Sequence, residues 1–119
     1  MGSGSLLLNA KKYSNKPDYI RYFGQELSTT TYNLARMNMF LHGVDDAKIW
    51  QGDTLSNPQN LENDQLMKFQ VVVANPPFSL DKWDSGFLAN AGLDAKGKKQ
   101  EKMTASLDPW KRFDIGVPP

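Results

Sequence analysis

Asn75, Pro76, Pro77 and Phe78 form the part of this sequence whose residue types point to the most specific chemistry. They follow residues 69–74, a β-branched run that is typical of a strand buried on both faces of a parallel sheet. Two successive prolines fix the backbone and remove two amide donors, which leaves the carbonyls of Asn75 and Pro76 able to accept hydrogen bonds from a ligand.

An Asn side-chain oxygen and an adjacent carbonyl can together accept both hydrogens of an exocyclic amine, while a neighbouring aromatic face stacks on the base that carries it. Such an arrangement lets the lone pair of the amine nitrogen develop towards an electrophilic methyl group without a strong general base. Taken alone, the motif fits equally well a double-proline turn that ends a strand, with Phe78 packed in the core.

The elements that must position this motif alternate between helices and strands. We expect a helix over residues 5–12, capped by Ser3 or Ser5, and then a strand over 19–23 that ends at Gly24. A second helix begins at a cap within 28–31 and ends at Gly43. A brief strand over 48–52, the strand over 69–74 and a long irregular loop over 80–119 follow. This alternation predicts an α/β domain with a mostly parallel sheet and flanking helices.

Three groups of residues lie at the carboxyl ends of the predicted strands, where ligands bind in open parallel sheets. They are Gly24-Gln25-Glu26, Gly52-Asp53 and the turn that begins at Asn75. Because they share this placement, we interpret them as parts of one candidate site.

With these motifs in view, the sequence resembles the N6-adenine DNA methyltransferases that carry an Asn-Pro-Pro-Phe catalytic motif, and most closely the modification subunits of type I restriction-modification systems. The resemblance covers nearly every residue from 2 to 119. The second half of the family's cofactor-binding motif resembles Gly2-Ser3-Gly4-Ser5-Leu6-Leu7-Leu8, and the acidic second motif with its helix resembles Gly24-Gln25-Glu26 and the helix that follows. The third motif matches Gly52-Asp53-Thr54-Leu55. A later stretch of the family resembles Arg112-Phe113 together with Gly116-Val117-Pro118-Pro119.

The resemblance implies a Rossmann-like fold that uses S-adenosylmethionine, and methylation of adenine N6 in DNA. It assigns catalysis to Asn75, Pro76, Pro77 and Phe78. It also implies four residues that bind the cofactor: Glu26 at the ribose hydroxyls, Asp53 at the adenine, and Gly2 and Gly4 where the backbone approaches closely.

Each cofactor-binding residue has a plainer interpretation. Glu26 also fits a solvated carboxylate near a helix start, where the helix dipole stabilises it. Asp53 fits an ordinary turn residue, and the Gly-Ser-Gly-Ser opening resembles an expression linker.

Parts of the family pattern are absent from the sequence. The first strand and its Asp-Pro pair would precede Gly2, and in the usual order that strand lies between the second and the fourth. The upstream helical domain and the downstream strands are also missing. We therefore expect a partial catalytic domain truncated at both ends, with a core over 1–79 and a loop over 80–119. We expect it to be inactive alone, to bind S-adenosylmethionine weakly or not at all, and to self-associate through residues 71–74.

Composition excludes several other classes of site. The 119 residues contain no Cys and one His, so disulfides, thiolate metal sites, a Cys nucleophile and a His-rich metal site are ruled out. No apolar run approaches the roughly 20 residues that cross a bilayer, and no signal peptide is visible, which predicts a protein without membrane contact. The resemblance implies the cytoplasm of a bacterium or archaeon.

The partners expected from the resemblance are DNA and the specificity and restriction subunits of a type I complex. The net charge of +1 gives no overall attraction to DNA. Lysines 96, 98, 99 and 102 lie near aromatic residues and suit either phosphate contacts or a solvated loop, and the residues alone favour the loop. Two alternatives remain open: a catalytically silent interaction module or fold fragment, and an RNA or protein-release-factor methyltransferase that shares Asn-Pro-Pro.

Overall fold

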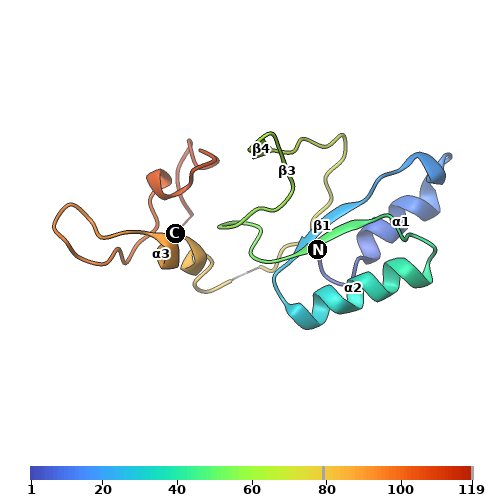
Figure 1. Cartoon of the computed structure of the whole chain (residues 1–119), viewed down its shortest axis with the longest axis horizontal. Coiled ribbons are helices and arrows are strands. Elements are labelled where there is room, and N and C mark those ends of the chain that lie inside the picture. Colours follow the sequence, from blue (N-terminus) through green and yellow to red (C-terminus); the bar gives the residue numbers. More distant parts are fainter. Residues whose placement is uncertain (79, 119) are drawn as a thin grey trace. The chain divides into compact units, whose positions relative to one another are not determined.

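The structure is a computed structural model that describes residues 1–78 and 80–118. The chain divides into two compact units (Figure 1). The first consists of Met1–Thr54 with Pro58–Pro76, and the second of Leu55–Asn57 with Pro77–Pro119.

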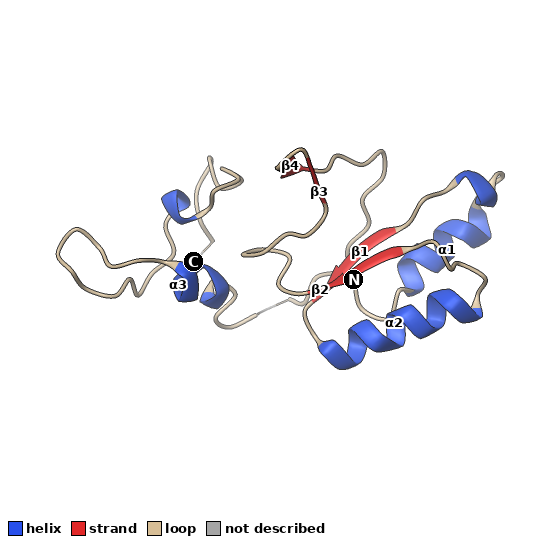
Figure 2. Cartoon of the chain, in the orientation of Figure 1, coloured by secondary structure: helices blue, strands red, loops and turns tan. Residues whose placement is uncertain are grey.

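The first unit is built around a strand-helix-strand motif (Figure 2). It begins with α1 (Ser5–Tyr13) and the short 3-10 turn η1 (Pro17–Tyr19), followed by β1 (Phe23–Glu26), α2 (Thr29–Leu41) and β2 (Lys48–Gln51). The strands β1 and β2 are parallel neighbours, with Phe23 opposite Lys48 and Glu26 opposite Gln51. A parallel pair needs a crossover connection, and α2 supplies it.

Both ends of α2 are specified by local sequence. Ser28 is the N-cap, and its side chain accepts a hydrogen bond from the Thr31 amide. At the other end Gly43 has a φ of 72°, and the amides of Gly43 and Val44 donate to the carbonyls of Phe40 and Met39. This is a complete Schellman motif, so the predicted cap and the predicted glycine stop of this helix are confirmed.

A small apolar core holds α2 against the strand pair. Tyr22, Met39 and Val44 are buried together, and Leu7, Leu8 and Ile20 pack against them. Ala35 is also buried, whereas Leu34, Met37, Phe40 and Leu41 on the same helix are exposed. One stripe of α2 therefore faces the core.

A hairpin that the sequence analysis did not predict follows the strand pair. It joins β3 (Leu61–Glu62) to β4 (Gln65–Leu66) in antiparallel pairing. Its two turn residues, Asn63 and Asp64, have φ values of 50° and 60°. Positive φ at both positions is the signature of a type I′ turn, which Asn and Asp tolerate well.

Two expectations near the N-terminus are wrong in detail. The helix over 5–12 is present as α1, but its N-cap is Gly4 in the left-handed conformation, and neither serine caps it, since Ser3 and Ser5 hydrogen-bond to each other. The strand expected over 19–23 lies over Phe23–Glu26, so Gly24 is inside it. Pro17 begins a 3-10 turn instead, and pairing with β2 determines where the strand starts.

The strand expected over residues 69–74 is not formed, which is the largest correction. Val71 and Val72 are 79% and 77% exposed, and this run belongs to no strand. At the start of the run, the ring of Phe69 packs against the ring of Phe23 with a centroid distance of 5.2 Å. A β-branched run becomes a strand only where a neighbouring strand accepts its backbone hydrogen bonds, and within residues 1–78 and 80–118 no strand pairs with it. The observed parallel sheet is accordingly one pair of strands.

The second unit contains more structure than the irregular loop expected over 80–119. It holds α3 (Ser85–Asn90), the 3-10 turn η2 (Ala105–Leu107) and an isolated bridge between Leu93 and Lys99. Phe87 on α3 is buried and packs with Trp83 and Phe113 at centroid distances of 6.4 and 6.0 Å. In neither unit does a helix of the described residues have the length and apolarity to cross a membrane.

Candidate functional site

Glu26, the last residue of β1, lies at the centre of the candidate site. One carboxylate oxygen, Oε2, accepts hydrogen bonds from the Gly2 amide at 2.8 Å and from the amino group of Met1 at 3.1 Å. The other oxygen, Oε1, accepts from the Ser28 amide at 3.1 Å. The structure thus brings together Gly2 and Glu26, two of the four residues that the resemblance assigned to cofactor binding.

These contacts keep the carboxylate ionised. Partial burial by itself raises the pKa of Glu26, but the hydrogen bonds from the amides of Ser28 and Gly2, together with the amino terminus, outweigh it and lower the pKa below its ordinary value. A carboxylate offers about four acceptor positions, so Glu26 can accept a further hydroxyl beside these donors. Its bond to Ser28, just before α2, also fits the plainer interpretation of a carboxylate at a helix start.

Asp53 lies at the same edge of the strand pair as Glu26. Glu26 is opposite Gln51 in the parallel register, and the amide of Gly52 donates to the Glu26 carbonyl at 2.9 Å. Asp53 follows Gly52 directly and is partly buried. The carboxyl ends of both strands therefore carry an acidic residue on one edge, the place where parallel sheets bind ligands.

The two glycines near the N-terminus differ in what surrounds them. Gly2 has a φ of 63°, and a side chain added there would meet nothing within 4 Å. Gly4 has a φ of 86°, and an added Cβ would lie 2.9 Å from the Cε atom of Met39. Gly2 leaves space for a ligand beside its backbone, whereas packing against α2 is enough to explain the glycine at position 4.

Asn75, Pro76, Pro77 and Phe78 are all exposed, and the Phe78 side chain is fully so. Asn75 and Pro76 end the first unit, while Pro77 and Phe78 begin a segment of the second. The alternative in which Phe78 packs in the core is therefore wrong for this structure. An aromatic ring held in solvent remains available to stack on a ligand.

Two further polar side chains, one in each unit, are buried and have partners that the sequence analysis did not indicate. Gln25 is 6% exposed, and its Oε1 accepts from the Gln59 amide at 2.9 Å, which holds the chain that returns from β2. Asp108 is 3% exposed and accepts from the Nε and Nη2 atoms of Arg112 at 3.1 and 2.9 Å. The spacing of four residues between Asp108 and Arg112 was the available signal, since it suits an ion pair within one turn.

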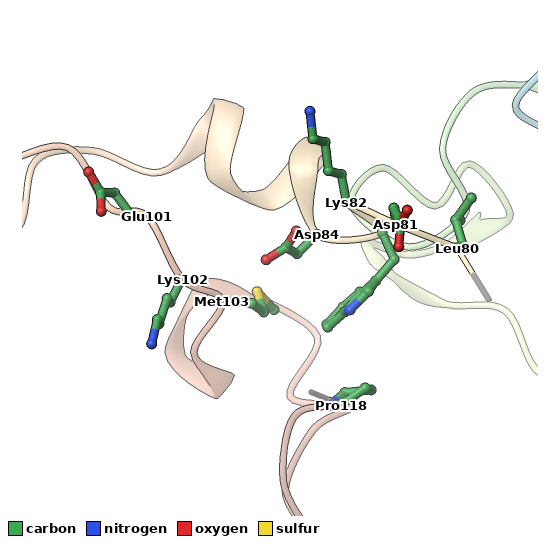
Figure 3. A pocket seen from close by; sticks show the side chains of 9 residues that line it. Leu80, Asp81, Lys82, Asp84, Glu101, Lys102, Met103 and Pro118 are labelled. Carbon is green, nitrogen blue, oxygen red and sulfur yellow. The ribbon is translucent and has the colours of Figure 1, made fainter.

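The second unit also contains a hollow of about 500 Å³ (Figure 3). Lys82 and Asp84 line it from one stretch of chain, and Glu101, Lys102 and Met103 line it from another. Because the lining carries both charges, it does not favour an anionic ligand. Across the described part of the chain, no three His, Cys, Asp or Glu side chains are grouped so that they could hold a metal ion.

The family and the relatives that match this chain are all methylases. Residues 1–110 match the N-6 DNA Methylase family. The type I restriction enzyme MpnII methylase subunit of Mycoplasma pneumoniae is 41% identical over 107 residues, which is 82% of this chain and 19% of that protein. The type I restriction enzyme MjaVIII methylase subunit of Methanocaldococcus jannaschii is 38% identical over 93 residues, 73% of this chain and 16% of that protein.

A solved structure agrees with these relatives. The crystal structure of the type I restriction-modification system methyltransferase subunit from Streptococcus thermophilus is 55% identical, with a TM-score of 0.50, and the match covers 56% of this chain and 15% of that one. The chain thus spans a fifth or less of the length of the relatives that it matches.

Proposed function

Because the chain belongs to the N-6 DNA methylase family, we propose that it forms part of the catalytic domain of a type I modification subunit. The whole protein would transfer a methyl group from S-adenosylmethionine to N6 of adenine in DNA. The observation that carries this proposal is the meeting of Gly2, Glu26 and the Gly52-Asp53 turn at one edge of a parallel strand pair.

The cofactor-binding part of the proposal is supported by the donor and acceptor types at that edge. Glu26 is an ionised acceptor suited to the two hydroxyls of a ribose, and Gly2 leaves room beside it. Asp53, at the end of the neighbouring strand, would accept from the adenine amine of the same ligand. When bound, S-adenosylmethionine supplies the electrophilic methyl group. A Rossmann-like order of further strands around β1 and β2 completes this proposal.

The catalytic part of the proposal rests on the turn that begins at Asn75. Its side-chain oxygen and the carbonyl of Pro76 would accept the two hydrogens of the target amine. Neither Pro76 nor Pro77 has an amide hydrogen that could compete for these two oxygens. Phe78 is exposed and would stack on the base, which must leave the duplex to reach the site. Binding the amine through acceptors raises the availability of its nitrogen lone pair without a separate general base.

The proposed partners follow from the same family. DNA would be the substrate, and the specificity and restriction subunits would complete the complex. The net charge of only +1 gives no overall attraction to DNA, and we assign sequence recognition to the specificity subunit.

Substitutions at the two parts of the site test this proposal in the whole protein that contains the chain, assembled with its specificity subunit. Asn75→Ala and Phe78→Ala should nearly abolish methylation, and Glu26→Gln should weaken binding of S-adenosylmethionine. Asn33→Ala and Phe40→Ala are the matched controls, since both side chains are exposed on α2. Wild-type methylation by either motif variant would refute the catalytic assignment.

A second candidate, a catalytically silent interaction module, is favoured by one observation, the exposed apolar run over residues 71–73. Titration with S-adenosylmethionine separates the two. If the whole protein shows no heat of binding in calorimetry, and the chain still captures a type I partner subunit, the silent module is the better description.

A further inference from the structure

One edge of β2 carries backbone groups that pair with no other strand. On the side of β1, the amides of Lys48 and Gly52 donate to the carbonyls of Tyr22 and Glu26. In a parallel pair these bonds recur at every second residue, so the N–H and C=O groups of Ile49 are directed away from β1. In the described part of the chain this sheet consists of β1 and β2 alone. The outer edge of β2 is therefore unpaired.

A hollow of about 450 Å³ follows this edge. Residues 47–50, four in succession, line it from the strand, and Tyr32 and Arg36 line it from α2. Successive residues of a strand point to opposite faces of the sheet, so four in a row border one hollow where it runs along the edge of the strand. The hollow therefore reaches the unpaired backbone groups of β2 and has α2 as its other wall.

The lining of this hollow is cationic. Arg36 and Lys48 are both exposed, and no Asp or Glu of the described residues lines the hollow. Neither cation forms an ion pair with a described carboxylate. The guanidinium group of Arg36 lies 5.6 Å from the centroid of the Tyr32 ring, a contact that leaves its N–H groups able to bind a carboxylate. The charges therefore favour an acidic occupant.

An extended polypeptide suits this edge better than DNA does. A strand presents amide donors and carbonyl acceptors in alternation, which match the outward C=O and N–H groups of Ile49. The sugar-phosphate backbone of DNA offers acceptors, so it would bind the two cations and leave the Ile49 carbonyl unpaired. A lysine on an edge strand also opposes pairing with apolar or basic strands, and Lys48 therefore selects for an acidic one.

We propose that the outer edge of β2, with the hollow against α2, is a docking site for an extended acidic segment of a partner protein. The segment adds to the sheet as a third strand and directs a carboxylate to Arg36. This site lies within the first unit. It uses none of the residues assigned to S-adenosylmethionine or to the target base, so the inference goes beyond the proposed function and does not depend on it.

The probe for this site is a capped hexapeptide of alternating Val and Glu, titrated into the whole protein that contains the chain. A copy of the peptide with N-methyl groups on every amide should bind about tenfold more weakly or worse, because it lacks the donors that pair with β2. A copy with Lys in place of Glu should also bind more weakly. Equal affinity of the three peptides would overturn the proposal, as would the absence of binding by the acidic one.

Arg36→Gln tests the cationic wall of the hollow. An exposed ion pair contributes little, so this variant should raise the dissociation constant of the acidic peptide about threefold. Lys12→Gln is the matched control, because Lys12 is an exposed cation that lies 5.3 Å from the ring centroid of Tyr13, outside the hollow. The control should bind the peptide as the wild type does. Equal losses in the two variants would mean that the peptide responds to overall charge and would refute the site.

Residue-resolved hydrogen exchange distinguishes strand addition from other modes of binding. The amides of Ile49 and Gln51 face outward, whereas those of Lys48 and Trp50 belong to the set that bonds to β1. The saturating peptide should slow exchange at the first two amides and leave the second two unchanged. Protection of all four amides, or of none, with the peptide bound would refute strand addition. Outward amides that are already protected without the peptide would show that the edge is occupied within the whole protein, which also overturns the proposal.

Other occupants of the edge give different results in the same assays. A DNA duplex that displaces the acidic peptide, and loses affinity in Arg36→Gln but not in Lys12→Gln, would replace the acidic segment with phosphate. A dimer seen by sedimentation without the peptide, with the outward amide of Ile49 protected, would assign the edge to a second copy. Either result would overturn the proposal of an acidic partner segment.

Discussion

The amide of Gly2 and the carboxylate of Glu26 are joined by a hydrogen bond of 2.8 Å across 24 positions of sequence. This contact ties the glycine-containing start of the chain to the end of β1. It also places an open glycine backbone beside an ionised acceptor, which is the combination that the proposed ribose site requires.

The lowered pKa of Glu26 predicts a specific dependence of stability on pH. A carboxylate whose pKa is lower in the folded state stabilises the fold fully above its ordinary pKa, 4.5, and that contribution is lost as the pH falls through the lowered folded value. In urea unfolding, Glu26→Gln should therefore be less stable than the wild type at pH 6, and the difference should shrink towards pH 3. Glu62→Gln, which removes an exposed carboxylate in the hairpin, is the control. A difference that does not change with pH would contradict this account of Glu26.

The N-cap of α2 can be tested without disturbing Glu26. Ser28→Ala removes the side-chain oxygen that accepts from Thr31 but keeps the backbone amide that donates to Glu26. The free energy of unfolding should fall by about 1 kcal/mol. Thr30→Ala, an exposed change in the same turn, should leave it unchanged or slightly higher. Equal effects of the two substitutions would mean that the cap contributes nothing.

Tyr22 offers a stabilising substitution. Its hydroxyl is buried without a hydrogen-bond partner among residues 1–78 and 80–118, and burial, followed by the nearby charge of Asp46, raises its pKa. An unsatisfied buried hydroxyl costs about 1–3 kcal/mol, so Tyr22→Phe should raise the free energy of unfolding by about 1 kcal/mol or more. Tyr19→Phe is the matched control, because the Tyr19 side chain is 85% exposed. A loss of stability in Tyr22→Phe would mean that the hydroxyl is satisfied in solution.

An element of the fold could be predicted where the residues that determine its ends lie within the element itself. The caps and stop of α2 lie within the helix itself, so Ser28 and Gly43 were sufficient. The start of β1 was misplaced because pairing with β2, more than 20 positions later, determines it. The helix α3 was missed because six residues carry too little periodicity, and Phe87 becomes buried only through contact with Trp83 and Phe113.

The site residues also differ in whether the sequence alone could place them. Glu26 and Asp53 could be placed at one edge from a general rule, because the carboxyl ends of adjacent parallel strands must coincide. The bond from Arg112 to the Leu55 carbonyl could not be predicted, since it spans 57 positions and depends on how the second unit folds. For Asn75 and Phe78 the residue types indicate the chemistry, but their catalytic role stays a prediction until the variants are assayed.

The exposed run over residues 71–74 predicts self-association of the chain. Val71, Val72 and Val73 are 79%, 77% and 46% exposed, and they lie in a segment that belongs to no strand. Such a segment has backbone groups able to pair with another chain and side chains that lose water when it does. Sedimentation over a wide range of concentrations should show dimers or larger species, and Val72→Lys should shift the equilibrium towards monomer, because a charge would be buried in each contact. Ile115→Lys, at a side chain that is 98% exposed in the second unit, should leave the equilibrium unchanged. A monomer at every concentration, with residues 71–74 exchanging at the rate of an open chain, would refute self-association and mean that the exposed run is simply solvated.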